Sequence, residues 1–417
     1  RVSYVMMHPE GADEMTLVIR EALNSLFVEV AVEIGVTVED ILEITLVANP
    51  IMHHILLGIS PVELGGAPFA LTTDAAVEVP AAELDLNING GGRIYILPCI
   101  AGHVGADTAG MILSEEPQEQ DQMTLLVDVG TNAEIVLGDR QRLLACSSPT
   151  GPAFEGAQIS CGQRAATGAI ERVRINPETL EPRFKVIGSD LWSDEDGFAE
   201  AIVTLGVTGI CGSGIIEVVA EMYLAGIVTV DGIVDGDLAS RTSRIIQNDR
   251  TWSYVLHSPE NDESQILVTQ NDIRQIQLAK AALYAGVKLL MDHIGTDRVE
   301  RIRLAGAFGS HINVQHAMVL GLIPDCVLGE VSSAGNAAGT GARIALLNSQ
   351  SREVIETLVK NIEKIETALE PKFQDYFVDA MAFPNKTDPF PNLFSVVTRP
   401  EAKIVTDNGG GRKRRRR

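Results

Sequence analysis

The segment LLVDVGTNAEIVLG, residues 125–138, decides the fold of this chain. Two apolar runs flank a short polar turn, a pattern that predicts two strands of a hairpin. Asp128 ends the first strand, where an ionised carboxylate is costly unless it meets a cation or hydrogen-bond donors. Gly130 permits a tight turn, and Thr131 and Asn132 supply donors. The turn therefore suits a Mg²⁺–phosphate group, with Asp128 reaching the metal through water; a plain hairpin turn is the alternative.

Three further glycine-rich turns lie in the same part of the chain: GICGSG (209–214), AGAFGSH (305–311) and GNAAGTG (335–341). Each lies where a helix is predicted to begin. Exposed N–H groups at a helix N-terminus bind phosphate. One such turn is weak support, but together with the turn at Asp128 they predict a nucleotide site.

The order of the predicted elements indicates an α/β protein. After a polar stretch at 114–123, three strands come first and helices then alternate with strands. The longest predicted helix covers 271–294, with Asn271 or Asp272 as its N-cap. The segment FQDYFVDAMAFP, 373–384, is expected to be strand-like.

Composition narrows the class of protein. A chain of 417 residues with 45% apolar content can form two globular lobes. The net charge of −23 argues against broad nucleic-acid binding, and the apolar runs are too short to span a membrane. The basic tail, 401–417, is predicted to be disordered, either as a solvated end or as a tether to an acidic partner, nucleic acid or membrane.

The five cysteines are scattered, with no CxxC pair. This pattern indicates a reducing cytoplasm and free thiols, and it offers no zinc or iron–sulfur spacing. Cys161 and Cys211 are interpreted as small packed residues, and the histidines as structural.

A three-strand meander that opens with D-x-G-T and is followed by strand–AGAFG–helix resembles one lobe of the acetate and sugar kinase, heat-shock chaperone and actin superfamily. The resemblance implies a two-lobed actin-like ATPase fold around an ATP cleft, with the first lobe incomplete and its own D-x-G-T hairpin upstream of residue 1. We therefore expect a chain truncated at its N-terminus. The expected division is 1–120 for the later part of the first lobe, 121–348 for the second lobe, 349–400 for a C-terminal helix and strand packing on both, and 401–417 for the tail.

Seven segments in order sharpen the resemblance, among them VANPIMHHILLGISPVELGGAPF, SSPTGPAFEGAQISCG and TQNDIRQIQLAKAAL. They are similar to the reductive activators of corrinoid-dependent methyltransferases. In that family a plant-type [2Fe–2S] domain, a linker and a middle domain precede the ATPase part, and we expect none of them here. The family usually has Gly-Asn where this chain has Ala48-Asn49.

The resemblance implies ATP-dependent return of a corrinoid from Co(II) to Co(I), with ATP and Mg²⁺ as cofactors and the [2Fe–2S] cluster only in the upstream domain. The partner is a corrinoid protein or corrinoid methyltransferase, which keeps the corrinoid. The resemblance does not identify the electron donor. It also leaves open whether the protein forms a homodimer, and whether such a dimer would hold a Cys-bridged iron–sulfur cluster at its interface. A small-molecule kinase and a non-catalytic ATP-dependent switch of the same fold are the alternatives.

The implied roles fall into three groups. Asp128 holds the metal water, and Asp107 either orients water or caps a helix. The residues expected to bind phosphate and adenosine are Gly130, Thr131, Asn132, Gly212, Gly214, Gly306, Ala307 and Gly309. The residues assigned to a partner-facing or mobile loop are Asn49, Phe154 and Glu155, with local turn support as the alternative for Asn49. Without the first phosphate turn, residues 1–417 are expected to bind nucleotide poorly.

Overall fold

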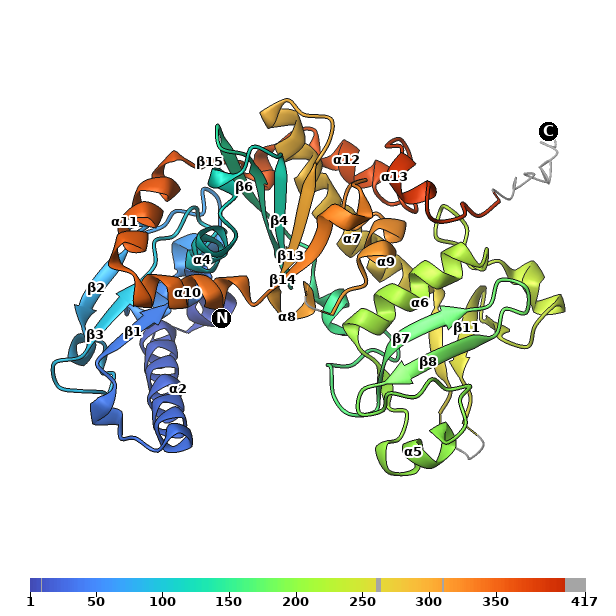
Figure 1. Ribbon diagram of the computed structural model, residues 1–417, viewed down its shortest axis with the longest axis horizontal. Coiled ribbons are helices and arrows are strands. Elements are labelled where there is room, and N and C mark those ends of the chain that lie inside the picture. The colour runs from blue at the N-terminus through green and yellow to red at the C-terminus, as the bar shows by residue number, and fades with distance from the viewer. Residues whose placement is uncertain (9, 260–263, 310, 402–417) are drawn as a thin grey trace, which may run out of the picture.

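The computed structural model describes residues 1–8, 10–259, 264–309 and 311–401. The tail predicted to be disordered lies outside the described residues, except for residue 401. The chain forms three parts side by side (Figure 1): a small lobe with the N-terminus, a central sheet, and an outer part that shares the core of the central sheet. No helix of the described residues has the length and apolar composition needed to cross a bilayer.

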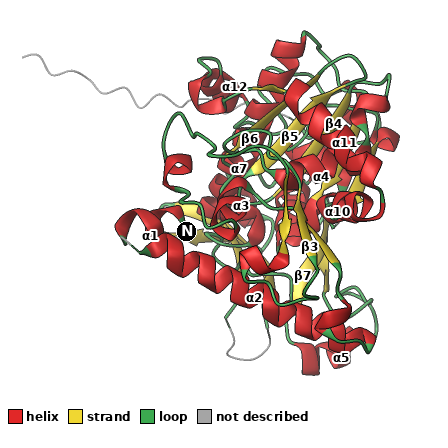
Figure 2. Cartoon of the chain, turned by 90° about the vertical axis from the view of Figure 1, so that its left-hand side faces the viewer, coloured by secondary structure: helices red, strands yellow, loops and turns green. Residues whose placement is uncertain are grey.

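The small lobe, here called lobe I, contains a three-stranded sheet of order β1-β3-β2. Strands β1 and β3 are parallel, and β2 is antiparallel at the edge. The long helix α2 crosses one face of this sheet and runs along the side of the molecule shown in Figure 2. The elements are α1 (Val2–Met7), α2 (Gly11–Ile34), β1 (Glu43–Leu46), α3 (Pro50–Leu56), β2 (Val77–Pro80), β3 (Arg93–Ile96) and α4 (Ala106–Glu115).

Lobe II is built on a six-stranded sheet of order β14-β13-β4-β5-β6-β15. Strands β4, β5 and β6 form the antiparallel meander predicted from the sequence, and β13 pairs parallel to β4. The central elements are β4 (Thr124–Val129), β5 (Ala133–Gly138), β6 (Leu143–Ser148), α7 (Gln270–Ile294), β13 (Arg301–Ala305), α8 (Gly306–Gly309), α9 (Val314–Leu320) and β14 (Val331–Gly335).

The outer part of lobe II adds two small sheets, of order β8-β7-β9 and β10-β11-β12. Its buried side chains belong to the same apolar core as the central sheet, so the two pack as one body. The elements are β7 (Ala169–Ile175), β8 (Pro182–Val186), α5 (Phe198–Leu205), β9 (Gly209–Ile210), α6 (Gly212–Leu224), β10 (Ile245–Asn248), β11 (Thr251–His257) and β12 (Ile266–Thr269).

The last part of the chain returns to both lobes. Helices α10 and α11 lie over lobe I, where Arg352 pairs with Glu43 of β1 at 2.6 Å, while α12 and α13 pack on lobe II (Figure 1). The predicted strand at 373–384 is wrong, since Phe373–Asp379 forms helix α12. The elements are α10 (Ala337–Leu347), α11 (Ser349–Leu358), β15 (Glu363–Lys364), α12 (Phe373–Asp379) and α13 (Pro391–Phe394).

The same order of elements occurs twice. Apart from β2, lobe I runs α2–β1–α3–β3–α4, and apart from the short helix α8, lobe II runs α7–β13–α9–β14–α10. In both copies a helix of 24 or 25 residues leads into a strand that pairs parallel with the next strand of the copy. In lobe II the strand β13 also pairs with β4, whereas β1 pairs only with β3 among the described strands.

Candidate functional site

The turn after β4 is braced by the loop that follows β6. The Gly130 N–H donates to the Asn132 carbonyl at 3.1 Å, which closes the turn. The Thr150 hydroxyl donates to the carbonyls of Gly130, at 2.8 Å, and Thr131, at 3.0 Å. Thr131 and Asn132 remain exposed, so their N–H groups and the Asn132 side chain are accessible at the turn, while the Thr131 hydroxyl donates to Glu155.

The D-x-G turn and the AGAFG turn meet at one edge of the sheet. Asp128 is the register partner of Ala305 in the parallel pair of β4 and β13, so both strands end side by side. Gly306 has a φ of +85°, and a Cβ there would overlap a carboxylate oxygen of Asp128. Only glycine accommodates both the left-handed conformation and this close approach. Figure 1 shows α8, which contains Ala307, at the end of these strands.

Three carboxyl groups gather beside this edge: Asp107, Asp128 and Glu134. Leu126 and Val136 face the core around α4, so strand alternation puts Asp128 and Glu134 on the same face. Asp128 and Glu134 are also register partners in the antiparallel pair of β4 and β5. Asp107 comes from the first turn of α4, so the group is supplied by two separate parts of the chain.

Burial changes the acidity of all three groups. It raises the pKa of Asp128 to about 6, with the charge of Asp107 as the second cause. Burial, followed by the charges of Asp107 and Asp128, raises the pKa of Glu134 to about 8. Burial also raises the pKa of Asp107, although the Thr108 N–H donates to that carboxylate at 2.8 Å. The electrostatics of this corner therefore favour a bound cation or protons.

The described residues provide no positive side chain to balance this charge. None of the three carboxyl groups forms an ion pair within the part of the chain that the structure describes. The same residues contain no group of three or more His, Cys, Asp or Glu side chains arranged to hold a metal ion directly. Mg²⁺ usually keeps several waters and takes one or two carboxylates together with substrate phosphates. The donor set around Asp128 fits that kind of site.

The first turn of α4 lies against the turn that follows β1. The N-cap of α4 is Gly105, whose built Cβ would lie 2.6 Å from the Ala48 carbonyl oxygen. Asp107 stands within the first turn, so its interpretation as the N-cap is wrong. Asn49 is the N-cap of α3, and its side-chain oxygen accepts the Met52 N–H at 2.9 Å. This bond matches the local turn support weighed for Asn49.

Helices α4 and α10 cross between the lobes at two glycines. A Cβ on Gly341 would overlap the carbonyl oxygen of Gly110, and a Cβ on Gly110 would lie 2.8 Å from the Ala338 carbonyl oxygen. Such an approach places the two backbones in direct contact. The helix that leaves lobe I and the helix that returns to it therefore touch within one turn of Asp107.

The remaining glycines have packing roles in the structure. A Cβ on Gly214 would overlap the Ile170 carbonyl oxygen, because the first turn of α6 lies directly on β7. A Cβ on Gly309 would lie 3.0 Å from the Leu304 carbonyl group. Gly212 begins α6 and is buried. Packing alone therefore explains why Gly214 and Gly309 carry no side chain, with or without a bound ligand.

In the GPAFEGA loop, the prediction that Phe154 faces a partner is wrong. Phe154 is 1% exposed and belongs to the core of lobe II, so its side chain cannot face a partner in this conformation. Glu155 is exposed, and it accepts a hydrogen bond from the Thr131 hydroxyl at 2.6 Å. Glu155 thus contacts the phosphate turn.

Glu134 and Thr150 were missed by sequence reasoning. Glu134 lies six positions after Asp128, at the spacing that makes two residues partners across a hairpin with a three-residue turn. That spacing in DVGTNAE was the available signal for Glu134. Nothing in the sequence near Thr150 connects it to a turn twenty residues earlier.

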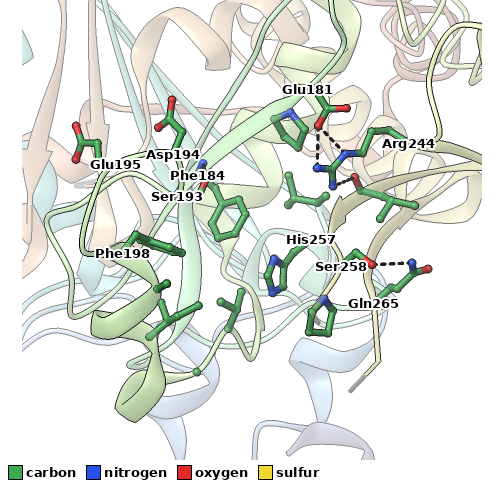
Figure 3. Close-up of a pocket in the computed structure, with 18 of the residues that line it drawn as sticks. Glu181, Phe184, Ser193, Asp194, Glu195, Phe198, Arg244, His257, Ser258 and Gln265 are labelled. Atoms are coloured by element: carbon green, nitrogen blue, oxygen red, sulfur yellow. Dashed lines mark hydrogen bonds and ion pairs between the residues drawn. The ribbon is translucent and has the colours of Figure 1, made fainter. Parts of the chain in front are cut away.

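A groove lies elsewhere, in the outer part of lobe II (Figure 3). It has a volume of about 1490 Å³ and is lined by β8, α5 and β11, with Phe184, Phe198 and His257 along its floor. Arg244 pairs with Glu181 at 2.8 Å at one end. None of the predicted site residues lines this groove.

The cysteines match their interpretation as packed thiols, whereas neither ring nitrogen of the buried His53 has a hydrogen-bond partner among the described residues. All five cysteines are free thiols, with Cys211 buried and Cys161 half-buried. His53 and His54 are fully buried, and burial lowers the pKa of His53 to about 4.

Comparison with known proteins matches the chain to two family models. Residues 122–394 match the C-terminal domain of RACo, the ASKHA domain. Residues 1–120 match the RACo middle region. The expectation that the family's middle domain is absent from this chain is therefore wrong.

The chain is also similar to characterised proteins. It is 32% identical over 391 residues to the corrinoid activation enzyme RamQ of Eubacterium limosum, covering 91% of this chain and 63% of the relative. It is 24% identical over 301 residues to the [Co(II) methylated amine-specific corrinoid protein] reductase of Methanosarcina barkeri, covering 70% of this chain and 52% of that protein. The solved structure of a reductive activator for corrinoid, iron–sulfur protein matches with a TM-score of 0.79 and 31% identity, covering 92% of this chain and 59% of that one. The chain thus spans less than two thirds of the length of these relatives.

Proposed function

Because the chain belongs to the RACo family of reductive activators, we propose that it is the ATP-binding and partner-docking part of a corrinoid activator. In this proposal, ATP binding or hydrolysis supports the return of a corrinoid from Co(II) to Co(I). The corrinoid remains on the partner protein. Both curated relatives carry names that refer to corrinoid activation or reduction, which supports this class of partner. The free cysteines suit a reducing cytoplasm.

One observation carries the assignment of the nucleotide site. The Asp128 carboxylate lies against Gly306, so the D-x-G turn and the AGAFG turn form a single corner. In the proposal Asp128 holds Mg²⁺ through water. Gly130 shapes the turn around the phosphates, and Thr131 and Asn132 bind them by their N–H groups and by the Asn132 side chain. Gly306, Ala307 and Gly309 support adenosine, with Gly212 and Gly214 nearby. When bound, Mg²⁺ would offset the negative charge of the phosphates and of the three carboxyl groups, Asp107, Asp128 and Glu134.

Asp107 is proposed to orient water next to the phosphates. It stands at the start of α4, beside Asp128, and its pKa is raised by burial. Glu134 shares this environment and is proposed to accept or hold a proton there, since burial raises the pKa of Glu134 to about 8. Asn49 and Glu155, which are exposed at the rim, are the proposed contacts with a partner or a moving loop.

The energy scale shows why ATP is needed. For one electron, about 59 mV corresponds to roughly 1.4 kcal/mol. Conformational coupling between sites typically supplies about 1–3 kcal/mol, equivalent to roughly 40–130 mV. Coupling of this size, by itself, shifts the reduction of Co(II) to Co(I) only weakly. ATP must add binding or hydrolysis energy, and closure of the lobes at the crossing of α4 and α10 is the proposed route to the docking face.

The proposal is tested by ATP turnover of the full-length protein with a Co(II) corrinoid partner. We expect the partner to stimulate turnover and Co(I) to appear in the visible spectrum in an ATP-dependent way. Asp128→Asn should reduce both signals at least a hundredfold, because the metal water loses its charged holder. Asp139→Asn, at the other end of the same meander, is the matched control and should leave both unchanged. Phosphorylation of a sugar or short acid, without any response to the corrinoid protein, would instead show a small-molecule kinase.

A further inference from the structure

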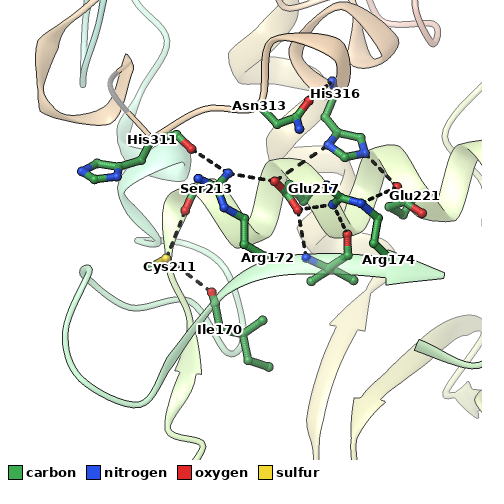
Figure 4. A network of polar contacts seen from close by, with 11 residues as sticks. Ile170, Arg172, Arg174, Cys211, Ser213, Glu217, Glu221, His311, Asn313 and His316 are labelled. Atoms are coloured by element: carbon green, nitrogen blue, oxygen red, sulfur yellow. Dashed lines mark hydrogen bonds and ion pairs between the residues drawn. The ribbon is translucent and has the colours of Figure 1, made fainter. Parts of the chain in front are cut away.

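A second polar network lies away from the three carboxyl groups of the candidate site, between β7, α6 and α9 (Figure 4). Its centre is Glu217 of α6, whose side chain is fully buried. Glu217 pairs with Arg172 and Arg174 of β7 and lies 3.9 Å from His316 of α9. Glu221 of α6 contacts Arg174 and His316 in turn. A buried charge is tolerated only where it is paired and hydrogen-bonded, so this network has to be complete in the folded protein.

The two glutamates lock α6 onto an incomplete edge of β7. Strand β7 pairs with β9 only at Ala169 and Ile170, so the N–H groups beyond have no strand partner on that side. Glu217 accepts the Val173 N–H at 2.9 Å, and Glu221 accepts the Ile175 N–H at 2.9 Å. The carboxylates therefore replace a strand, and α6 and β7 behave as one rigid unit.

Arg172 connects this unit to the segment that follows the AGAFG turn. Its Nη1 lies 2.9 Å from Glu217 Oε1 and also donates to the His311 carbonyl at 3.0 Å. His311 comes two residues after α8 and shortly before α9. Because the buried Glu217 cannot move, the Arg172 guanidinium bound to it has little freedom. Arg172 therefore fixes the position of the His311 carbonyl.

A second link joins α9 to α6. The Asn313 side chain caps α9 by accepting the His316 N–H at 3.1 Å. His316 Nε2 lies 2.8 Å from Glu221 Oε1. The segment after the AGAFG turn is thus attached at a backbone carbonyl by Arg172 and at the first turn of α9 by Glu221.

We propose that Arg172 is a positioning residue for nucleotide binding: gripped by Glu217, it fixes the segment that leaves the Gly306–Gly309 turn and so keeps that turn in place for adenosine. This inference rests on the proposed nucleotide site. Both contacts are made by Nη1, whose two N–H groups are held in the plane of the guanidinium, whereas the ammonium of a lysine rotates freely on a flexible stem.

Arg174 offers a matched control. It lies two residues along the same strand, pairs with the same glutamate at 2.5 Å, and has nearly the same side-chain exposure, 35% against 32% for Arg172. It does not reach His311: its Nη1 donates to the carbonyl of its own neighbour, Val173, and its Nε lies 4.0 Å from Glu221 Oε1, a much longer contact than that between Arg172 and Glu217. Removal of either arginine leaves Glu217 with the other one.

The first test measures MgATP affinity by calorimetry on the full-length protein. Arg172→Met should weaken MgATP binding at least tenfold, whereas Arg174→Met should change it less than twofold at a similar loss of thermal stability. Arg172→Lys keeps the charge opposite Glu217 and preserves folding, and it should still weaken binding severalfold. Equal effects of Arg172→Met and Arg174→Met, or wild-type affinity in Arg172→Lys and Arg172→Met, would overturn the proposal.

A second readout separates this inference from the proposed function. Amide hydrogen exchange of the nucleotide-free protein should rise at least fivefold in α9 for Arg172→Met and stay unchanged there for Arg174→Met. Failure of the wild-type protein to bind MgATP would count against the proposed function, while the exchange data would still decide whether Arg172 positions this segment. Unchanged exchange in α9 of Arg172→Met would refute the positioning role.

Discussion

At the scale of single residues, the candidate site is defined by burial more than by residue type. Asp107, Asp128 and Glu134 are ordinary carboxyl groups in the sequence. Their raised pKa values come from the low dielectric of the corner and from one another's charge. Raised pKa values of this kind are common at functional sites.

The free energy of unfolding should depend on pH in a direction set by these groups. Their pKa values are higher in the folded state than in the unfolded state, so the folded protein binds more protons. The stability that these proton-binding groups add to the folded state is complete below about pH 4. It is lost as the pH rises through about 6 for Asp128 and about 8 for Glu134. We expect urea unfolding without nucleotide to show the decline, and Glu134→Gln to flatten it above pH 7. The exposed carboxyl variant Glu83→Gln is the control; an equally steep decline in Glu134→Gln would contradict the assignment.

At the scale of elements, caps and close contacts decide where helices begin and how they pack. Helix α7 is N-capped by Thr269, and not by Asn271 or Asp272 as predicted. Asp272 completes a capping box by accepting the Thr269 N–H at 2.8 Å, and it also accepts the Ser160 N–H at 2.7 Å. The helix therefore begins earlier, and Asp272 joins it to the loop before β7.

The crossing of α4 and α10 should not tolerate a side chain at Gly341. Gly341→Ala puts a methyl group into the carbonyl oxygen of Gly110, so the helices must separate. We expect a loss of about 1–3 kcal/mol in the free energy of unfolding, the usual cost of overpacking. Arg343→Ala, at an exposed position of the same helix, should cost less than about 0.5 kcal/mol.

Small-angle scattering would show whether this crossing also serves as a hinge. MgATP should reduce the radius of gyration of the wild-type protein and of Arg343→Ala, but less in Gly341→Ala. Equal compaction in all three proteins would mean that the lobes do not rotate about these glycines.

At the scale of the whole molecule, the first helices of the two repeated units, α2 and α7, differ in how much of their surface is buried by other elements. Helix α7 is mostly buried beneath the meander of lobe II. Helix α2, its counterpart in lobe I, buries only Gly11, Phe27 and Ala31. Its exposed apolar side chains are Leu17, Val18, Leu26, Val28, Val30, Val32 and Ile34. Helix α2 therefore presents an apolar surface that the described residues leave uncovered.

This surface should make residues 1–417 bind apolar probes and self-associate. Val18→Lys together with Val32→Lys should lower the fluorescence of a bound naphthalene sulfonate dye at least twofold and shift light scattering towards the monomer. The melting temperature should stay within about 2 °C, because both side chains are exposed, at 59% and 73%. Val203→Lys, at an 84% exposed position on α5, is the control and should leave dye binding unchanged.

The sequence by itself determined the α/β class, the meander at 124–148, the glycine turns and the family, because these depend on local periodicity and on residues that occur in a fixed order. It also placed Asp128 and Gly306 in one site through the resemblance. Its errors at single residues concern Phe154, the caps of α4 and α7 and the segment 373–379, where an aromatic or polar residue fits two local states and long-range packing chooses between them. It also failed to identify residues 1–120 as the middle region of the family.

Only the tertiary structure decided what meets across the chain. Glu134 joins Asp107 because strand alternation and the first turn of α4 point to the same corner. Arg172 reaches His311, 139 residues away, because Glu217 is buried between β7 and α6. Contacts of this range leave no trace in local pattern, since they arise from the burial of charge and from backbones that touch only when the chain is folded.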